Sequence, residues 1–282
     1  MKRQLDLFLL YREHGMYLLS SGSGYPVLFI HGMPTSGQLW SGIIDKMRGQ
    51  FTCHAVDLPG LGKTPSAANG PGQLDVLAEQ LEQIRVKNGI EKWHVVGHDA
   101  GAAIAVQYAY RFPQHVDHLA LLSPAIFPEL KPFHLFRILR TPILGELFAP
   151  LVSAIFWKVA MRRALEQQRA ELNSVVREFH QPFSGPWGAW RLMAVTRWGD
   201  PAKVLAAMPD ILPRLLMPTL IFQGSHDPAV PEGFARRASA LIPRSKCVVV
   251  DSGHFIPLNN PEVVAAELLR FFDAGVSAVP AD

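Results

Sequence analysis

The stretch "VVGHDAG", residues 95–101, decides how this chain is expected to fold. It ends a run of strand-forming residues and leads into the helix-like stretch "AAIAVQYAYRF" at 102–112. The spacing of Gly97, Asp99 and Gly101 matches G-x-S-x-G, a sharp turn between a strand and a helix that exposes a serine hydroxyl. Here the central residue is aspartate. The pattern therefore predicts a carboxylate at the tip of such a turn.

Short apolar runs on both sides of this turn alternate with segments of helical length. The runs are rich in Val, Ile, Leu and Phe without strict alternation, which is typical of strands buried on both faces. They lie at 26–32, 51–57, 93–99, 116–123, 218–224 and 245–251, and helices are expected at 36–48, 73–88, 101–112, 231–242 and 261–273. This alternation predicts an α/β fold with a mostly parallel central sheet flanked by helices, preceded by a hairpin within residues 1–22.

One long segment breaks the alternation. Between Ser123 and Pro218 the sequence has helical character and no convincing strand, and it holds four of the six tryptophans: Trp157, Trp187, Trp190 and Trp198. So long a structureless loop is not expected in a compact domain, and a folded helical insertion is predicted instead. It would lie over the strand ends, where open parallel sheets bind ligands. We predict a core of residues 1–123 and 214–282 and a helical cap, or lid, of residues 124–213.

Composition excludes several functional classes. The chain has 282 residues, of which 49% are hydrophobic and 18% charged, and its formal net charge is only +3. No basic block occurs, so nucleic acid is not an expected partner. No apolar run approaches the roughly 18 residues of a membrane span, and Asp6 interrupts the apolar residues at the start, so neither a membrane partner nor a signal peptide is expected.

The two cysteines, Cys53 and Cys247, lie in apolar strand-like runs and show no metal-binding spacing. They are expected to be buried free thiols of a protein in a reducing compartment. A cytoplasmic monomer or homodimer is therefore the default expectation.

Chemically active side chains follow several of the predicted strands. The loop 31–40 follows the first buried strand and Asp99 follows the third, whereas Asp227 follows the fifth and His254 the sixth. Because the carboxyl ends of parallel strands meet at one edge of a sheet, these loops are expected to converge. The chain order of carboxylate, second carboxylate and histidine matches the order of nucleophile, acid and base in known catalytic triads.

With these motifs the chain resembles an α/β-hydrolase from end to end, with a cap inserted at the usual point. The G-H-D-x-G elbow is similar to that of the aspartate-nucleophile branch, which includes haloalkane dehalogenases and epoxide hydrolases, and "HGMPTSGQLW" and "RTPILGEL" are more similar to the dehalogenases. The resemblance implies that Asp99 is the nucleophile, His254 the base and Asp227 its partner. It also implies an oxyanion hole made by the backbone N–H groups of Met33 and Ala100.

An aspartate nucleophile suits a different reaction from a serine nucleophile. A carboxylate is a weak nucleophile that is already ionised near neutral pH. It is suited to displacing a leaving group from saturated carbon, which produces an ester whose carbonyl belongs to the enzyme. His254 would then activate the water that attacks this ester, while Asp227 would fix the imidazole tautomer. Asp227 could alternatively serve only as a cap of the following helix, and His31 and His98 are expected to be packing or supporting residues.

The leaving-group donors of the two subfamilies are missing from their usual positions. Haloalkane dehalogenases hold halide with donors at the positions of Met33 and Ala100, and neither of these side chains can donate a hydrogen bond. Trp157 in the cap is a candidate donor, although core packing is the simpler interpretation of it. A small residue at position 100 and an apolar one at 33 favour a bulky apolar organic substrate.

Epoxide hydrolases protonate the opening ring with cap tyrosines, but all five tyrosines lie outside the predicted cap: Tyr11, Tyr17, Tyr25, Tyr108 and Tyr110. His180 or His134 could serve as the acid instead, with surface exposure as the simpler interpretation of His180. Phe255, next to the predicted base, is a further candidate for the substrate pocket.

Four functions therefore remain open. The leading prediction is a dehalogenase-like hydrolase, and an epoxide hydrolase is its nearest rival. The third is a lactone or ester hydrolase, or a lyase or cyclase that uses Asp99 as acid or base. The fourth is a non-catalytic small-molecule receptor with a closing lid. No metal or cofactor is expected, because the sequence has neither metal-ligand spacing nor a glycine-rich phosphate loop: "GLGKT" at 60–64 lacks the first glycine of such a loop.

Overall fold

The central element of the protein is a twisted sheet. The structure is a computed structural model, and it describes residues 9–13, 15–66, 73–161 and 170–276. In this part of the chain eight strands form one sheet in the order β1-β2-β4-β3-β5-β6-β7-β8. Their bounds are β1 Leu9–Glu13, β2 Met16–Ser21, β3 Tyr25–Ile30, β4 Phe51–Asp57, β5 Trp93–His98, β6 Val116–Leu122, β7 Thr219–Gly224 and β8 Ser245–Val250.

The sheet has the predicted mixed character. β1, β2 and β4 pair in antiparallel fashion, and every pair from β4 through β3 to β8 is parallel. Each predicted buried strand is present within one or two residues of its expected bounds, and the predicted N-terminal hairpin is formed by β1 and β2. Residues 1–8, including Asp6, lie outside the described part. The predicted α/β fold with a mostly parallel sheet is confirmed.

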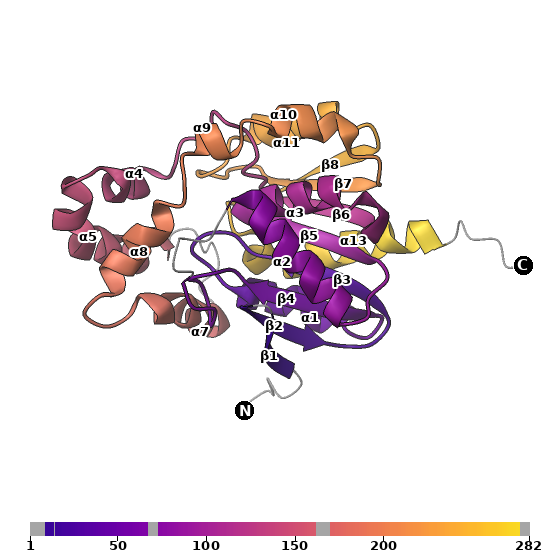
Figure 1. Ribbon diagram of the computed structural model, residues 1–282, viewed down its shortest axis with the longest axis horizontal. Coiled ribbons are helices and arrows are strands. Elements are labelled where there is room, and N and C mark those ends of the chain that lie inside the picture. Colours follow the sequence, from indigo (N-terminus) through magenta and orange to yellow (C-terminus); the bar gives the residue numbers. More distant parts are fainter. Residues whose placement is uncertain (1–8, 14, 67–72, 162–169, 277–282) are drawn as a thin grey trace, which may run out of the picture.

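Helices cover both faces of this sheet. α2 (Leu74–Lys87) packs on α3 (Ala100–Arg111) on one side, and α1 (Ser41–Met47) packs on α13 (Pro261–Val276) on the other, as the front and rear layers of Figure 1 show. α11 (Glu232–Leu241) contacts β7 and β8. The remaining core elements are short: η1 Gly37–Trp40, η2 Pro113–His115 and α12 Ile256–Asn259. The five helices predicted for the core are therefore all observed.

The segment between β6 and β7 is helical, as expected, and we call residues 123–218 the insertion. Its described elements are α4 His134–Arg140, α5 Leu144–Ile155, the π-helical turn η3 Phe156–Ala160, α7 Ala170–His180, η4 Gln181–Phe183, α8 Gly188–Thr196, α9 Pro201–Val204, α10 Met208–Ile211 and η5 Leu212–Arg214. α4, α5 and α8 pack on one another and lie together at the left of Figure 1, with α5 outermost. The insertion thus forms a helical layer beside the sheet.

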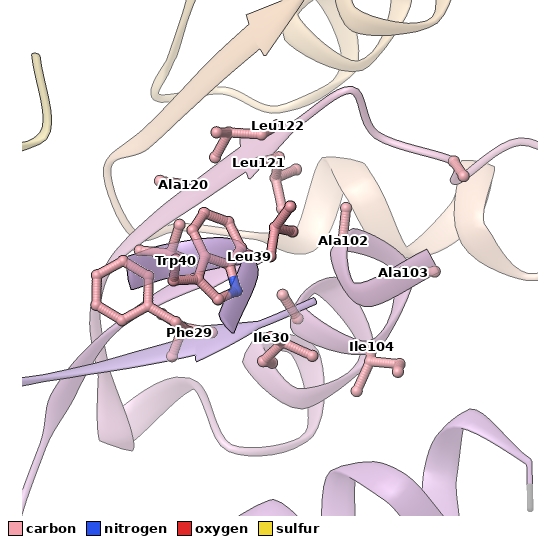
Figure 2. Packing of buried hydrophobic residues seen from close by; sticks show 14 of the residues in the cluster. Phe29, Ile30, Leu39, Trp40, Ala102, Ala103, Ile104, Ala120, Leu121 and Leu122 are labelled. Carbon is pink, nitrogen blue, oxygen red and sulfur yellow. The ribbon is translucent and has the colours of Figure 1, made fainter. Parts of the chain in front are cut away.

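The hydrophobic core fills the space between the sheet and its helices. Figure 2 shows Trp40 of η1 against Phe29 of β3, with the ring centroids 5.2 Å apart. Small residues of α3, among them Ala102 and Ala103, let this helix lie close to the strands. This close packing fixes the N-terminal end of α3 next to the end of β5, which positions the turn between them.

The edge strand β8 departs from the expected burial. Cys53 of the inner strand β4 is fully buried, and burial raises the pKa of its thiol to about 12. Cys247 of β8 is only half-buried, so the expectation that both thiols are buried is wrong for Cys247. The reason is its position in the order of strands, because β8 has a neighbour on one side only.

Candidate active site

Asp99 occupies the strained turn that the sequence predicts. It lies between β5 and α3 with φ +52° and ψ −122°, a conformation that costs energy for any residue with a side chain. The two flanking glycines allow the turn. A Cβ atom on Gly97 would lie 2.5 Å from the carbonyl oxygen of Gly101, and one on Gly101 would lie 2.4 Å from the carbonyl oxygens of Ile30 and His31. The chain can make this turn only where both side chains are absent.

Replacing Gly101 by alanine is therefore expected to destabilise the protein by about 3 kcal/mol or more, since the clash is with rigid backbone. Gly233 is a matched control, because it is also the second residue of a helix and its added Cβ would meet nothing within 4 Å. Gly233→Ala is expected to stabilise by about 0.5 kcal/mol. Thermal unfolding measures both changes, and equal effects of the two substitutions would contradict the proposed packing of the turn.

Backbone donors hold the Asp99 carboxylate. The N–H of Met33 donates to Oδ2 at 3.0 Å, and the N–H of Ala100 also bonds to this carboxyl group. Gly32 makes the approach possible, because a Cβ there would lie 2.5 Å from both Cβ and Oδ2 of Asp99. The two N–H groups predicted as an oxyanion hole thus point at the carboxylate itself.

The structure brings His254 and Asp227 to the other side of Asp99. His254 Nε2 lies 3.9 Å from Asp99 Oδ1, and His254 Nδ1 lies 3.0 Å from Asp227 Oδ2. The Asp227 side chain is fully buried and that of His254 is 8% exposed. Asp227 Oδ1 also accepts the N–H groups of Ala229 and Val230 in the loop before α11. No side chain caps the N-terminus of α11, so Asp227 is placed as the partner of His254 and its interpretation as a helix cap is wrong.

The loops that carry Asp227 and His254 meet because glycine allows close backbone contact. A Cβ on Gly224, at the end of β7, would lie 2.4 Å from the carbonyl oxygens of Ser252 and Gly253. His98 Nε2 lies 2.9 Å from the carbonyl oxygen of His254, and the two rings are 4.8 Å apart. His98 therefore holds the loop of His254 in place through this backbone carbonyl.

The pKa values of the three groups are coupled. Burial raises the pKa of Asp99, and the charge of His254 and the N–H donors of Ala100 and Met33 offset this only partly. Burial lowers the pKa of His254, but the charge and hydrogen bond of Asp227 and the charge of Asp99 outweigh it, so the net shift is upward. Burial likewise opposes ionisation of Asp227, but His254 and the two backbone donors bring its pKa down to about 2. Asp227 is therefore a permanent anion beside the imidazole.

His31 and His98 have the supporting roles expected of them. Both are fully buried, and burial lowers their pKa values to about 4 and about 3. His31 Nε2 accepts the N–H of Leu58, and its Nδ1 lies 2.7 Å from the carbonyl oxygen of Gly32. This neutral ring ties the loop of Met33 to the end of β4.

A cavity of about 570 Å³ opens above the Asp99 carboxylate. Met33, Ala100 and His254 lie at its base, and two of the predicted pocket residues, His134 and Phe255, also line it. The insertion provides most of the remaining wall, including Phe136, Phe156, Val159, Trp198 and Leu205. The lining is predominantly apolar, so the cavity suits a bulky hydrophobic molecule.

The predicted pocket role of Trp157 and His180 is not supported. Neither lines the cavity. Trp157 instead packs edge-on against His180 at 5.0 Å and stacks on Phe183 at 5.6 Å, inside the insertion. The contact between Trp157 and His180 joins two segments that lie far apart in the sequence, so the sequence alone does not predict it.

For Trp187, Trp190 and Trp198 the simplest expectation from sequence is packing in the core of the insertion. Trp198 instead lines the cavity, and Trp187 is exposed. No pattern around Trp198 in "TRWGDP" distinguishes it from the other tryptophans.

The "GLGKT" turn is a structural element. The N–H of Lys63 donates to Asp57 Oδ2 at 2.8 Å, and the Thr64 hydroxyl donates to the carbonyl oxygen of Asp57. A Cβ on Gly62 would lie 2.2 Å from Asp57 Oδ2. The turn surrounds the buried Asp57 carboxylate. Because the N–H of Lys63 already donates to this carboxylate, it is not free to bind phosphate. Among the described residues, no cluster of histidine, cysteine and acidic side chains has the geometry of a metal site.

Comparison with known proteins agrees with this architecture. The family model described as alpha/beta hydrolase fold matches residues 25–261. A haloalkane dehalogenase of Bradyrhizobium diazoefficiens is 25% identical over 288 residues, covering 90% of this chain and 88% of that protein. A cis-3-alkyl-4-alkyloxetan-2-one decarboxylase of Shewanella oneidensis is 23% identical and covers 95% of this chain and 90% of that protein.

Two other matches differ widely in how much of the chains they cover. An abhydrolase domain-containing protein of Caenorhabditis elegans is 35% identical over 111 residues, and this chain spans only 25% of its length. The structure of a putative epoxide hydrolase from Pseudomonas aeruginosa superposes with a TM-score of 0.84 at 19% identity, covering 99% of both chains. At that identity the structural match concerns the fold alone.

Proposed function

The chain belongs to the α/β-hydrolase fold family, and we propose that it is a cofactor-independent hydrolase in which Asp99 forms an ester with a bulky apolar substrate. One observation carries this proposal. The Asp99 carboxylate lies at the base of an apolar cavity with Oδ2 held by the backbone N–H of Met33 and Oδ1 near His254. A carboxylate held in this way has one free oxygen that can attack a bound carbon atom.

The first step of the proposed reaction is displacement at saturated carbon. Asp99 Oδ1 forms a bond to this carbon while the leaving group departs with the bonding electron pair. Holding Oδ2 in place orients Oδ1 toward the cavity, which lowers the entropic cost of attack. The ionised carboxylate is required, so this step is expected to slow as pH falls through the raised pKa of Asp99.

The second step is hydrolysis of the ester. His254 accepts a proton from water as the water oxygen attacks Cγ of Asp99, and the negative charge develops on Oδ2, where the N–H groups of Met33 and Ala100 stabilise it. Asp227 stabilises the imidazolium that results. Ester formation removes the charge of Asp99, which is one cause of the raised pKa of His254. Its pKa therefore falls in the intermediate, where a neutral base is needed.

The insertion is proposed to act as the cap of this site. The insertion supplies most of the residues that line the cavity, and an apolar wall excludes water from the carboxylate during alkylation. The boundaries 124–213 remain our proposal for this cap.

A second candidate reaction follows from the missing leaving-group donors. Met33 and Ala100 offer no side-chain donor at the base of the cavity, so a leaving group that needs little stabilisation is favoured. Opening of an oxetan-2-one at its alkyl carbon releases a carboxylate that is stable without such donors. Loss of carbon dioxide with expulsion of Asp99 would then give an alkene. The Shewanella oneidensis relative that acts on oxetan-2-ones covers 95% of this chain, which supports testing this reaction.

Product analysis tests the proposal and separates the candidates. The purified protein is incubated with a long-chain bromoalkane, with styrene oxide and with a cis-3,4-dialkyloxetan-2-one. Bromide with alcohol indicates a dehalogenase, diol indicates an epoxide hydrolase, for which His134 is the candidate acid at the cavity, and alkene with carbon dioxide indicates a decarboxylase. No turnover of any of the three classes would contradict the proposal and favour a receptor.

A further inference from the structure

The outer face of α5 is apolar, although it is exposed. Its side chains at every third or fourth position point away from the buried face of the helix, and η3 continues the pattern. We call these residues the apolar stripe: Leu144, Leu147, Phe148, Leu151, Ile155 and Val159. Leu147 is 69% exposed and Leu151 57% exposed. A helix on the surface of a globular protein usually carries polar residues on its outer face, and a contiguous apolar stripe of this length indicates a contact surface.

The residue before the stripe is held in a costly conformation. Ile143 has φ +67°, which is an outlier for a β-branched side chain. It is also 80% exposed, more than any other large apolar side chain in the described residues. This backbone conformation is energetically unfavourable, and it places the Ile143 side chain in solvent next to the first turn of α5.

The stripe continues into the active-site cavity. Ile155 and Val159 belong to the stripe and also line the cavity, and Phe156 of the same helical segment lines it as well. An apolar molecule could therefore pass from the surface covered by the stripe to Asp99 along apolar side chains.

The segment that carries the stripe has more positive than negative charges. Residues 131–161 contain four cationic side chains, Lys131, Arg137, Arg140 and Lys158, and one acidic side chain, Glu146. Glu146 is already paired with Arg197, at 2.5 Å. Apolar residues beside such cations are characteristic of helices that lie in the interface of an anionic lipid layer. A second copy of this chain would instead bring like charges together, which is unfavourable.

From these observations we infer that the apolar stripe docks on an anionic lipid surface and admits the substrate to the cavity from that surface. The inference rests on the proposed function only in taking the cavity as the site of an apolar substrate. It replaces the expectation from sequence that no membrane is a partner, and it concerns a surface contact. None of the described helices has the length and hydropathy needed to cross a bilayer.

Vesicle sedimentation tests this inference. The parent protein, the Leu147→Glu/Leu151→Glu variant and the Val86→Glu/Val263→Glu variant are mixed with vesicles of equal parts phosphatidylglycerol and phosphatidylcholine. Val86 of α2 and Val263 of α13 are also exposed, 62% and 45%, but lie on core helices. We expect the stripe variant to bind at least tenfold more weakly than the parent and the control variant to bind like the parent. Raised salt and pure phosphatidylcholine vesicles should both weaken binding of the parent.

The inference is overturned if the parent does not sediment with the vesicles, or if the parent and the stripe variant bind equally well. A dimeric parent that becomes monomeric in the stripe variant, without vesicle binding, would assign the stripe to a second copy. If the stripe variant has the same melting temperature as the parent, misfolding is excluded as the cause of lost binding. The Asp99→Asn variant should bind vesicles normally, so a failure of the proposed chemistry would be distinguishable from a failure of docking.

Discussion

His254→Ala is expected to leave the protein covalently modified by its substrate. His254 takes no part in displacement at saturated carbon, because Asp99 is the attacking group in that step. It is required to activate the water that attacks the ester, and its Nε2 is near Asp99 Oδ1, at 3.9 Å. The intact mass of the variant, after incubation with a substrate that the parent converts, should therefore rise by one alkyl group per chain. Peptide mapping should locate this group on Asp99.

His226 provides the control for this experiment. It lies in the same loop as Asp227, and its side chain is 54% exposed. His226→Ala should turn over substrate like the parent and accumulate no adduct. An unmodified His254→Ala protein, or an adduct on a residue other than Asp99, would contradict the proposed order of steps and favour acid or base chemistry by Asp99.

Asp99→Asn is expected to lose activity by about 10⁴-fold or more, since the amide cannot act as the nucleophile. Asparagine is the appropriate substitution because it keeps the shape of the side chain and tolerates the φ of +52°. Asp251→Asn is the matched control, because the Asp251 carboxylate follows β8 and its side chain is 99% exposed. The control should retain full activity. An active Asp99→Asn protein, shown by mass to retain asparagine, would contradict the role of this residue.

The same variant should be more stable than the parent, with a characteristic dependence on pH. Burial raises the pKa of Asp99 above 3.8 in the folded protein, so ionisation of this carboxyl group costs folding free energy as pH rises through the raised pKa. Replacement by asparagine removes that cost. The gain in melting temperature should be near zero below the unperturbed pKa and greatest in neutral and alkaline solution. A gain that is independent of pH would show that relief of backbone strain, not loss of charge, is its origin.

The fold was predictable because its signals are local. Strands buried on both faces give continuous apolar runs, and the glycine spacing around Asp99 permits only a tight turn. Since parallel strands end at one edge, the meeting of Asp99, Asp227 and His254 followed from their positions in the chain. The half-exposure of Cys247 was not predictable from its apolar neighbours, because it depends on which strand forms the edge of the sheet.

The wall of the cavity was less predictable, since it depends on how the helices of the insertion pack. Trp157 lies in the apolar stretch "AIFWKVA" and Trp198 precedes Gly199, but neither context tells that Trp157 packs inside the insertion and that Trp198 lines the cavity. The apolar stripe on α5 likewise looks like a core helix in the sequence. Only its exposure in the structure distinguishes an outward contact surface from a buried one.

The most direct test of the account follows solvent oxygen through one turnover. The parent protein, in excess over substrate, is allowed to react once in water enriched in ¹⁸O, and the peptide that contains Asp99 is then weighed. Attack of water on the enzyme ester predicts one ¹⁸O atom in the Asp99 carboxylate and none in the alcohol product. A product alcohol that carries the heavy oxygen, with an unlabelled Asp99, would contradict the ester intermediate.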